Sequence, residues 1–206
     1  REDYLMLNDY MRSLDENYFV YEIYPGLGMF REYDTPYDMK FKQYAAIACG
    51  AKGINYWQWR SERIGHEADC AGLVRMNGKP RPVAEEVKRF GETLLKDGGL
   101  LASAKAKTAD FAIVFDYDSS LISAIDDYCV DNSFKRNPNM RGYFHGALKG
   151  GYRLLTSGGY AVDFVHTTTP EKFGDYKVLY FPYCVMENEK LAPYIEKFVK
   201  NGGIVV

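Results

Sequence analysis

The chain of 206 residues lacks the features that mark several large classes of protein. It contains no apolar run near the roughly 18 residues that a membrane-spanning helix needs. Its 26 basic and 28 acidic residues leave a net charge of −2, so there is no basic surplus to bind the phosphates of a nucleic acid. Its 19 glycines and 8 prolines are too few for a collagen-like or low-complexity chain. We therefore expect a globular protein with neither membrane nor nucleic-acid partners.

Cysteine is scarce and widely spaced. Cys49, Cys70, Cys129 and Cys184 form no Cys-x-x-Cys pair, no zinc-ligand spacing and no disulfide framework. This pattern favours reduced thiols and a cytoplasmic location, and we expect no metal ion and no cofactor. Cys184 follows an expected strand without the small neighbours of a nucleophile elbow. We therefore expect it to be a buried structural thiol and not the nucleophile of an amidotransferase-like enzyme.

The two ends of the chain lack the features of a complete protein. The chain starts at Arg1, without an initiator methionine or an apolar leader. It stops after three β-forming residues, Ile204 to Val206, which are typical of a strand. We interpret both ends as cuts and expect a piece of a larger protein, whose localisation signals would lie upstream.

Aromatic residues, by contrast, are abundant. The 18 tyrosines, 12 phenylalanines and 2 tryptophans make up 16% of the chain. An excess of this kind is typical of a large packed core and also of enzymes that stack sugars on aromatic rings, so it favours neither interpretation alone.

The first 97 residues predict two repeats of strand, polar loop and helix. The expected elements are helices over 2–14, 37–50 and 82–97 and strands over 18–22 and 54–59. Each polar loop follows the carboxyl end of a strand, which is where (β/α)8 barrels hold their active sites. We interpret residues 1–97 as two βα units of such a TIM barrel, about a quarter of the whole.

The remaining residues predict a second domain with a different organisation. Residues 98–109, with Gly98 and Gly99, are interpreted as a linker. Residues 110–206 alternate buried strands with helices, apart from an irregular insertion expected over 119–140. This alternation predicts a doubly wound parallel sheet of flavodoxin-like or amidotransferase-like type. The fold class is therefore α/β throughout, with both domains incomplete.

Glu22 is the first candidate for a catalytic residue. Its carboxylate stands at the end of an expected strand, beside aromatic residues and the turn at Pro25 and Gly26. A carboxylate in that place can attack the anomeric carbon of a sugar when a second carboxylic acid protonates the leaving oxygen. A solvated or salt-bridged glutamate is the alternative.

Glu67 and several aromatic residues are candidates for binding a sugar. Glu67 lies in the loop after the second strand and can accept hydrogen bonds from sugar hydroxyls, or it can form a loop salt bridge. Phe30, Trp57 and Trp59 can form an apolar platform for a sugar ring, or they can belong to the core. Trp57 and Trp59 alternate along the expected strand, so we expect both on the same face of it.

Segments in both halves of the chain resemble the glycoside hydrolase family 42 β-galactosidases. Residues 19–25, FVYEIYP, with Phe30 eight positions after Glu22, resemble the nucleophile segment of that family. Residues 56–61, YWQWRS, with the loop 65–67, GHE, resemble the segment that follows the last barrel strand. In the second half, the segments that resemble the middle, trimerisation domain of the family are 111–116, 152–155, 162–165, 176–179 and 202–203.

The resemblance implies a retaining enzyme that hydrolyses terminal β-D-galactosides through a covalent glycosyl-enzyme on Glu22. Glu67 then accepts a hydrogen bond from a galactose hydroxyl, and Phe30, Trp59 and Cys70 contact the substrate. Phe30 stands where the family usually has tryptophan. Cys70 stands where it usually has histidine, and a thiol is a weaker hydrogen-bond partner than imidazole. A related glycosidase with a different sugar specificity is therefore an alternative.

The resemblance also implies where this chain lies in its parent protein. Residues 1–97 become the last two βα units of the barrel, and residues 110–206 become most of the trimerisation domain. We therefore expect a homo-oligomer, a trimer, assembled through the second half. The acid/base glutamate of the family belongs to an upstream segment, so the chain alone is expected to be inactive. The alternative from another functional class is a non-catalytic flavodoxin-like module for oligomerisation or binding.

Overall fold

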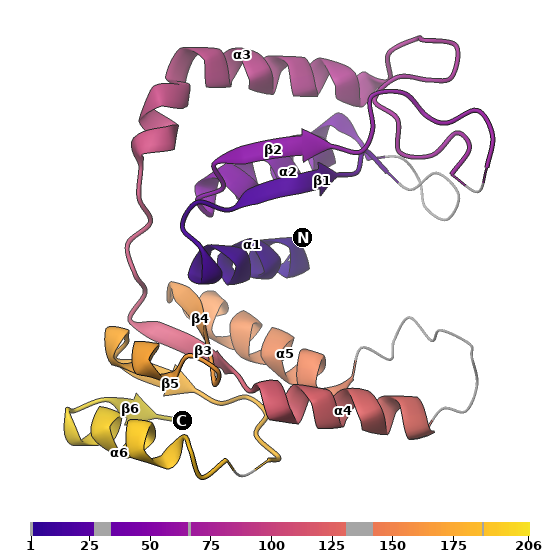
Figure 1. Cartoon of the computed structure of the whole chain (residues 1–206). Coiled ribbons are helices and arrows are strands. Elements are labelled where there is room, and N and C mark those ends of the chain that lie inside the picture. Colours follow the sequence, from indigo (N-terminus) through magenta and orange to yellow (C-terminus); the bar gives the residue numbers. More distant parts are fainter. Residues whose placement is uncertain (1, 27–33, 66, 131–141, 187) are drawn as a thin grey trace. The chain divides into compact units, whose positions relative to one another are not determined.

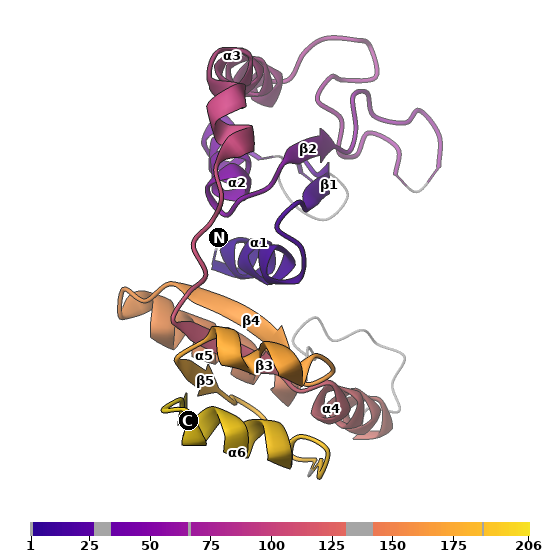
Figure 2. The ribbon, with the colours of Figure 1, turned by 60° about the vertical axis from the view of Figure 1, so that its left-hand side comes forward.

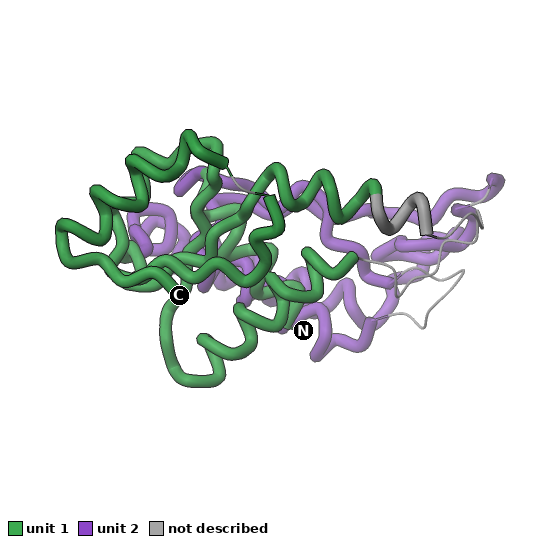
Figure 3. Tube along the Cα trace, turned by 90° about the horizontal axis from the view of Figure 1, so that it is seen from below, with its two compact units in different colours: residues 1–14, 107–206 green, residues 15–106 purple. Residues whose placement is uncertain are grey.

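The computed structural model describes residues 2–26, 34–65, 67–130, 142–186 and 188–206. Within them the chain forms two compact units, which Figure 3 draws in different colours. We call residues 15–106 the strand-pair unit, and residues 1–14 together with 107–206 the four-stranded unit. None of the helices in the described residues is long and apolar enough to cross a membrane.

The strand-pair unit is built from two βα repeats. Its elements are β1 (Phe19–Ile23), α2 (Pro36–Ala48), β2 (Gly53–Tyr56) and α3 (Pro82–Ser103). The two strands are parallel neighbours, with Phe19 opposite Gly53 and Val20 opposite Ile54 (Figure 1). Parallel pairing places the carboxyl ends of β1 and β2 side by side. The buried core under the strands consists of Ile23, Met39, Leu73 and Val83.

The helix α3 is longer than predicted. It runs through Gly98 and Gly99 to Ser103, where the sequence pattern predicts a linker from residue 98. Lys52 Nζ donates a hydrogen bond to the carbonyl of Ala104, just past the end of the helix, at 2.6 Å. A positive charge at this end is favourable because the last carbonyls of a helix carry partial negative charge. Lys52, from a distant part of the sequence, therefore stabilises the end of the extended helix.

The four-stranded unit is a parallel sheet with helices on both faces. Its elements are α1 (Glu2–Leu14), β3 (Phe111–Phe115), α4 (Tyr117–Val130), α5 (Tyr143–Ser157), β4 (Val162–His166), η1 (Pro170–Asp175), β5 (Val178–Tyr180), α6 (Ala192–Lys200) and β6 (Ile204–Val205). The strands stand in the order β4-β3-β5-β6 (Figures 1 and 2). Counted in chain order within this unit, that is the two-one-three-four order of flavodoxin-like sheets. The predicted doubly wound parallel sheet is therefore confirmed.

Alternation along β3 gives this sheet two apolar faces. Ala112 and Val114 point to one face, where Phe173 of η1 and Phe198 of α6 pack against the strand. Ile113 points to the other face, where its buried partners are Phe144, Leu148, Tyr152, Val162 and Phe164. The three central residues of β3 are 0% exposed. Burial on both sides explains why the sequence there is a continuous apolar run.

The helix α4 takes the place of much of the irregular insertion expected over 119–140. Asp116, the first residue after β3, is buried and accepts hydrogen bonds from the Ser119 amide at 3.5 Å and the Ser119 hydroxyl at 2.6 Å. This is the geometry of a helix N-cap. Asp118 adds negative charge in the first turn, where the helix dipole favours it. The predicted irregular insertion is therefore wrong for residues 119–130, because Asp116, Asp118 and Ser119 start a helix there. Residues 131–140 lie outside the described residues.

The helix α1 belongs to the four-stranded unit, whereas the sequence pattern groups it with the barrel repeats. Ser13 Oγ accepts a hydrogen bond from the Phe164 amide at 2.9 Å, and Arg12 Nη2 donates one to the Val162 carbonyl at 3.3 Å. Arg12 also forms an ion pair with Asp163 at 2.9 Å. Because β4 is the edge strand, α1 covers polar backbone groups that another strand would otherwise be able to bind.

Replacing Ser13 by alanine is expected to speed hydrogen exchange at the Phe164 amide by several-fold to about tenfold. The amide loses its acceptor, and a hydrogen bond of this kind contributes a net stability of about 1 kcal/mol. Exchange detected by NMR measures the effect, and Ser13→Thr, which keeps the hydroxyl oxygen, is the matched control. Equal exchange at Phe164 in the two variants would show that Ser13 does not protect the edge.

Candidate active site

The carboxyl end of β1 presents a carboxylate that is bound by a tyrosine. Glu22 is the penultimate residue of β1, and Tyr24 is the first residue after the strand. The Tyr24 hydroxyl donates to Glu22 Oε2 at 2.5 Å, the short distance typical of a hydroxyl bound to a carboxylate. Among the residues that the structure describes, Glu22 Oε1 has no hydrogen-bond partner. One oxygen of the carboxylate is therefore held and the other is open.

The carboxyl end of β2 brings a second carboxylate to the same edge. The Trp57 amide donates to the Ile23 carbonyl at 3.1 Å, so the residue after β2 lies beside the end of β1. The Trp57 indole Nε1 donates to Glu67 Oε2 at 3.3 Å. The charge of Glu67 also acts on the Tyr24 hydroxyl. Glu22, Tyr24, Trp57 and Glu67 therefore gather where the two strands end.

The strand β2 ends at Tyr56, three residues earlier than predicted. The peptide bond from Trp57 to Gln58 is cis, and the Gln58 amide donates to the Ala71 carbonyl of the following loop at 2.7 Å. Trp57 is half-buried beside Glu67, whereas Trp59 is 70% exposed. The expectation that the two tryptophans share one strand face is therefore wrong, because the strand ends before either of them.

The loop that carries Glu67 is tied to the rest of the strand-pair unit. The Asp69 amide donates to the Glu62 carbonyl at 3.1 Å, and the Asp69 carboxylate forms an ion pair with the buried Arg81 at 2.8 Å. Asp69 and Ala71 have φ angles of 53° and 52°, a left-handed conformation that costs a non-glycine residue about 1 kcal/mol. Contacts that maintain this conformation also give Glu67 a defined place.

The predicted site residues fall into different environments. Glu22 and Glu67 lie together at the ends of β1 and β2. Trp59 is exposed, and Cys70 is 4% exposed, so its thiol is packed inside the unit. Phe30 lies outside the described residues. Within the described part of the chain, no three histidine, cysteine, aspartate or glutamate side chains are placed to hold a metal ion.

Tyr24 is the residue of this site that the sequence interpretation missed. Its position two residues after Glu22, directly before Pro25, is a sequence signal that points to it. The hydrogen bond to Glu22, partial burial and the negative charges of Glu22 and Glu67 raise the pKa of Tyr24 to about 12. Tyr24 is therefore protonated at neutral pH and acts as a donor to Glu22.

Cys184 lies after β5, at the carboxyl edge of the four-stranded sheet. The residue is exposed, so the expectation of a buried thiol is wrong. Partial burial of this exposed residue, a hydrogen bond to Asp116 and the negative charge of Asp116 raise the pKa of Cys184 to about 11. The thiol is therefore protonated at neutral pH, whereas a cysteine nucleophile has to be a thiolate. The Ser119 hydroxyl binds the amides of Val185 and Met186 at 2.9 and 3.2 Å, which holds the loop after β5 over this edge.

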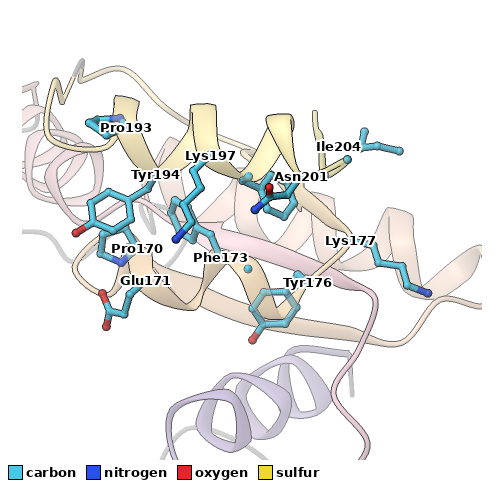
Figure 4. Close-up of a pocket in the computed structure, with 14 residues that line it drawn as sticks. Pro170, Glu171, Phe173, Tyr176, Lys177, Pro193, Tyr194, Lys197, Asn201 and Ile204 are labelled. Atoms are coloured by element: carbon cyan, nitrogen blue, oxygen red, sulfur yellow. The ribbon is translucent and has the colours of Figure 1, made fainter.

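A hollow of about 570 Å³ lies between η1 and α6 in the four-stranded unit. Tyr194 and Lys197 extend from α6 toward Pro170 and Phe173 of η1 (Figure 4). Its lining contains one carboxylate, that of Glu171, so it lacks the carboxylate pair that glycoside hydrolysis needs. None of its lining residues belongs to the strand-pair unit, and the hollow is therefore separate from the site around Glu22.

Two family models match the chain one after the other. The first, described as β-galactosidase, matches residues 1–96. The second, described as β-galactosidase trimerisation domain, matches residues 109–206. The gap between the two matches, residues 97–108, covers the end of α3 and the segment that leads to β3.

Known β-galactosidases are similar to this chain over nearly its whole length. The β-galactosidase of Geobacillus kaustophilus is 31% identical over 208 residues and covers 98% of the chain. The solved β-galactosidase structure from the haloarchaeon Halorubrum lacusprofundi covers 99% of the chain with a TM-score of 0.77 and 25% identity. The structure from Bacillus circulans sp. alkalophilus covers 99% with a TM-score of 0.81 and 21% identity, which supports the fold.

The chain spans about 29% of the length of each of these three relatives. The strand-pair unit has the fold of two βα units of a β/α-barrel enzyme, and the four-stranded unit is the parallel-sheet domain that follows it. The predicted fold class and family are both confirmed. The chain therefore belongs to glycoside hydrolase family 42, the β-galactosidases.

Proposed function

We propose that the full-length protein containing this chain is a retaining β-galactosidase with Glu22 as its nucleophile. The main support is the carboxylate of Glu22 at the carboxyl end of β1, with Oε2 bound by Tyr24 at 2.5 Å and Oε1 not bound by any described residue. The carboxyl ends of barrel strands are where enzymes of this fold hold their catalytic groups. Family membership supports a terminal β-D-galactoside as the substrate.

The proposed reaction has two steps. In the first, Glu22 Oε1 attacks the anomeric carbon, the bond from that carbon to the leaving oxygen breaks, and a carboxylic acid protonates this oxygen. In the second, water adds to the anomeric carbon, gives its proton to the same carboxylate, and returns the electron pair of the ester bond to Glu22. We assign this acid/base carboxylate to a barrel strand upstream of the chain, about 5–5.5 Å from Glu22 in the assembled site.

We propose that Glu67 holds the sugar and does not react. Its Oε2 accepts the Trp57 indole hydrogen, and a carboxylate is an acceptor suited to galactose hydroxyls. The half-buried Trp57 is better placed beside Glu67 than the exposed Trp59 to offer an aromatic ring face. Cys70 is buried, so we propose that it affects sugar specificity through the shape of the loop that carries Glu67. We propose Phe30 as a second residue that affects this specificity.

The four-stranded unit is proposed to assemble the protein into a trimer. The match of residues 109–206 to a β-galactosidase trimerisation domain supports this role. A non-catalytic module would account for this unit alone. It would not account for Glu22 and Glu67 at the neighbouring ends of β1 and β2, which support catalysis as the function of the strand-pair unit.

The stereochemistry of hydrolysis tests the proposed function. A retaining enzyme inverts the anomeric carbon twice, so the full-length protein is expected to release β-galactose first from an aryl β-galactoside. Proton NMR at early times distinguishes this product from the α anomer before the two equilibrate. Release of α-galactose first would indicate a single displacement by water and would exclude Glu22 as a nucleophile.

A further inference from the structure

The Tyr24 hydroxyl binds Glu22 Oε2, and none of the residues that the structure describes binds Oε1. We propose that Tyr24 is a positioning residue that fixes Glu22 through Oε2, directs Oε1 at the anomeric carbon and speeds the breakdown of the glycosyl-enzyme more than its formation. This inference rests on the proposed role of Glu22 as the nucleophile.

The backbone that carries Tyr24 is itself held by α2. Lys42 Nζ donates to the Tyr24 carbonyl at 3.0 Å and pairs with the Asp34 carboxylate at 2.5 Å. The Asp34 amide in turn donates to the Pro25 carbonyl at 3.0 Å. The side chains of Lys42 and Asp34 are 27% and 16% exposed, so this support is partly shielded from water. The Tyr24 hydroxyl therefore reaches Glu22 without the entropy cost of ordering a free loop.

Tyr24 acts on Glu22 as a hydrogen-bond donor. The groups around its hydroxyl are the carboxylates of Glu22 and Glu67, and both favour the protonated phenol over a tyrosinate. The Lys42 ammonium is bound to the Tyr24 carbonyl, on the backbone. The hydroxyl therefore keeps its proton far above neutral pH, and its contact with Glu22 persists during turnover.

The hydrogen bond affects the two steps unequally because the charge on Glu22 changes in opposite directions. When the glycosyl-enzyme forms, Oε1 gives an electron pair to the anomeric carbon and the carboxylate becomes a neutral ester, so the bond from Tyr24 to Oε2 weakens. When the ester breaks, the pair returns to Glu22 and this bond strengthens in the transition state. Loss of the hydroxyl therefore slows breakdown of the glycosyl-enzyme directly. Its effect on formation is smaller, because the nucleophile is less well oriented but its carboxylate, no longer stabilised by the hydrogen bond, is more reactive.

In the full-length protein, Tyr24→Phe is expected to lower kcat for 2,4-dinitrophenyl β-galactoside by about 10- to 100-fold, the range for a hydrogen bond to a charged group. KM should fall with kcat, so that kcat/KM changes by less than about threefold. The glycosyl-enzyme should accumulate and be visible by mass spectrometry after rapid quenching. Tyr56→Phe is the matched control, because the Tyr56 hydroxyl on β2 binds Gln43 and not Glu22. Its kcat and KM should stay near those of the wild type.

The 206-residue chain allows a second test that needs no activity. Carbon-13 NMR of tyrosine labelled at Cζ follows the ionisation of Tyr24, which Tyr24→Phe identifies. We expect a pKa of about 12 in the wild type and a return toward 10.0 in Glu22→Gln, because the anionic partner is gone. A Tyr24 titration that is the same in both proteins would overturn the contact and the proposal with it.

The outcomes separate this inference from the proposed function. Equal losses of kcat and kcat/KM in Tyr24→Phe, or no accumulation of the glycosyl-enzyme, would overturn the role of Tyr24 and leave Glu22 as the nucleophile. A glycosyl group found on another carboxylate of the wild-type enzyme would overturn both.

Discussion

Replacing Glu22 by alanine in the full-length protein is expected to lower kcat for β-galactosides by on the order of 10⁴-fold or more. The change removes the oxygen that bonds to the anomeric carbon, so no glycosyl-enzyme forms, while Glu67 and Trp57 remain to bind the sugar. Azide fits the space left by the carboxylate and should restore part of the rate with an activated aryl galactoside. Release of the aryl group measures both effects, and the product of rescue should be the α-galactosyl azide.

The control for this experiment is Glu85→Ala. Glu85 is an exposed carboxylate in the first turn of α3, and its removal is expected to leave the rate unchanged. Near-normal turnover by Glu22→Ala would mean that another residue is the nucleophile.

Replacing Asp163 by alanine is expected to destabilise the four-stranded unit by about 3 kcal/mol. The carboxylate is 5% exposed, pairs with Arg12 at 2.9 Å and accepts a hydrogen bond from the buried Ala109 amide at 2.9 Å. The substitution leaves this amide without its acceptor and leaves Arg12 with Asp9 as its remaining carboxylate partner. Hydrogen exchange of the slowest amides in β3 and β4 measures the loss of opening free energy.

Asp110→Ala is the matched control for the effect of burial. Asp110 stands just before β3 and pairs with Lys177 at 3.0 Å, but the two side chains are 55% and 75% exposed. Surface pairs of this kind contribute about 0–1 kcal/mol. Equal losses of stability in Asp163→Ala and Asp110→Ala would contradict the larger contribution expected from the buried carboxylate.

The features that the sequence predicts correctly have local signals. The apolar run from Phe111 to Phe115 is typical of a strand covered on both faces, and β3 is such a strand. Pro25 and Gly26 predict the end of a strand near Glu22, and β1 ends at Ile23, whereas the catalytic role of Glu22 stays a prediction. In both cases, neighbouring residues are enough to define the environment.

Other features depend on contacts between distant residues, which a single sequence does not reveal. Lys52 binds the Ala104 carbonyl at the end of α3, 52 positions away in the sequence. Ser13 binds the Phe164 amide, 151 positions away. From the sequence alone, Gly98 predicts the end of a helix. The residues of α1 likewise fit the pattern of the barrel repeats. Their observed places are results of tertiary structure.

Two further features, the start of α4 and the partner of Glu22, have local signals in the sequence. Asp116 followed by Ser119 is the spacing of a helix N-cap, but the polar residues after β3 were interpreted as a loop. Tyr24 lies two residues after Glu22 and directly before the turn at Pro25, close enough along the chain for its hydroxyl to bind the carboxylate. In both cases a hydroxyl residue two or three positions after a carboxylate is able to bind it, and this spacing can be read from the sequence.

The identity of the nucleophile is tested most directly by trapping the glycosyl-enzyme. A 2-deoxy-2-fluoro-β-galactoside with a good leaving group reacts with the nucleophile, and the ester then breaks down slowly because the fluorine destabilises the positively charged transition state. Mass spectrometry of proteolytic peptides from the labelled full-length protein is predicted to place the sugar on Glu22. A label on any other carboxylate, or no label on a protein that hydrolyses β-galactosides, would contradict this assignment.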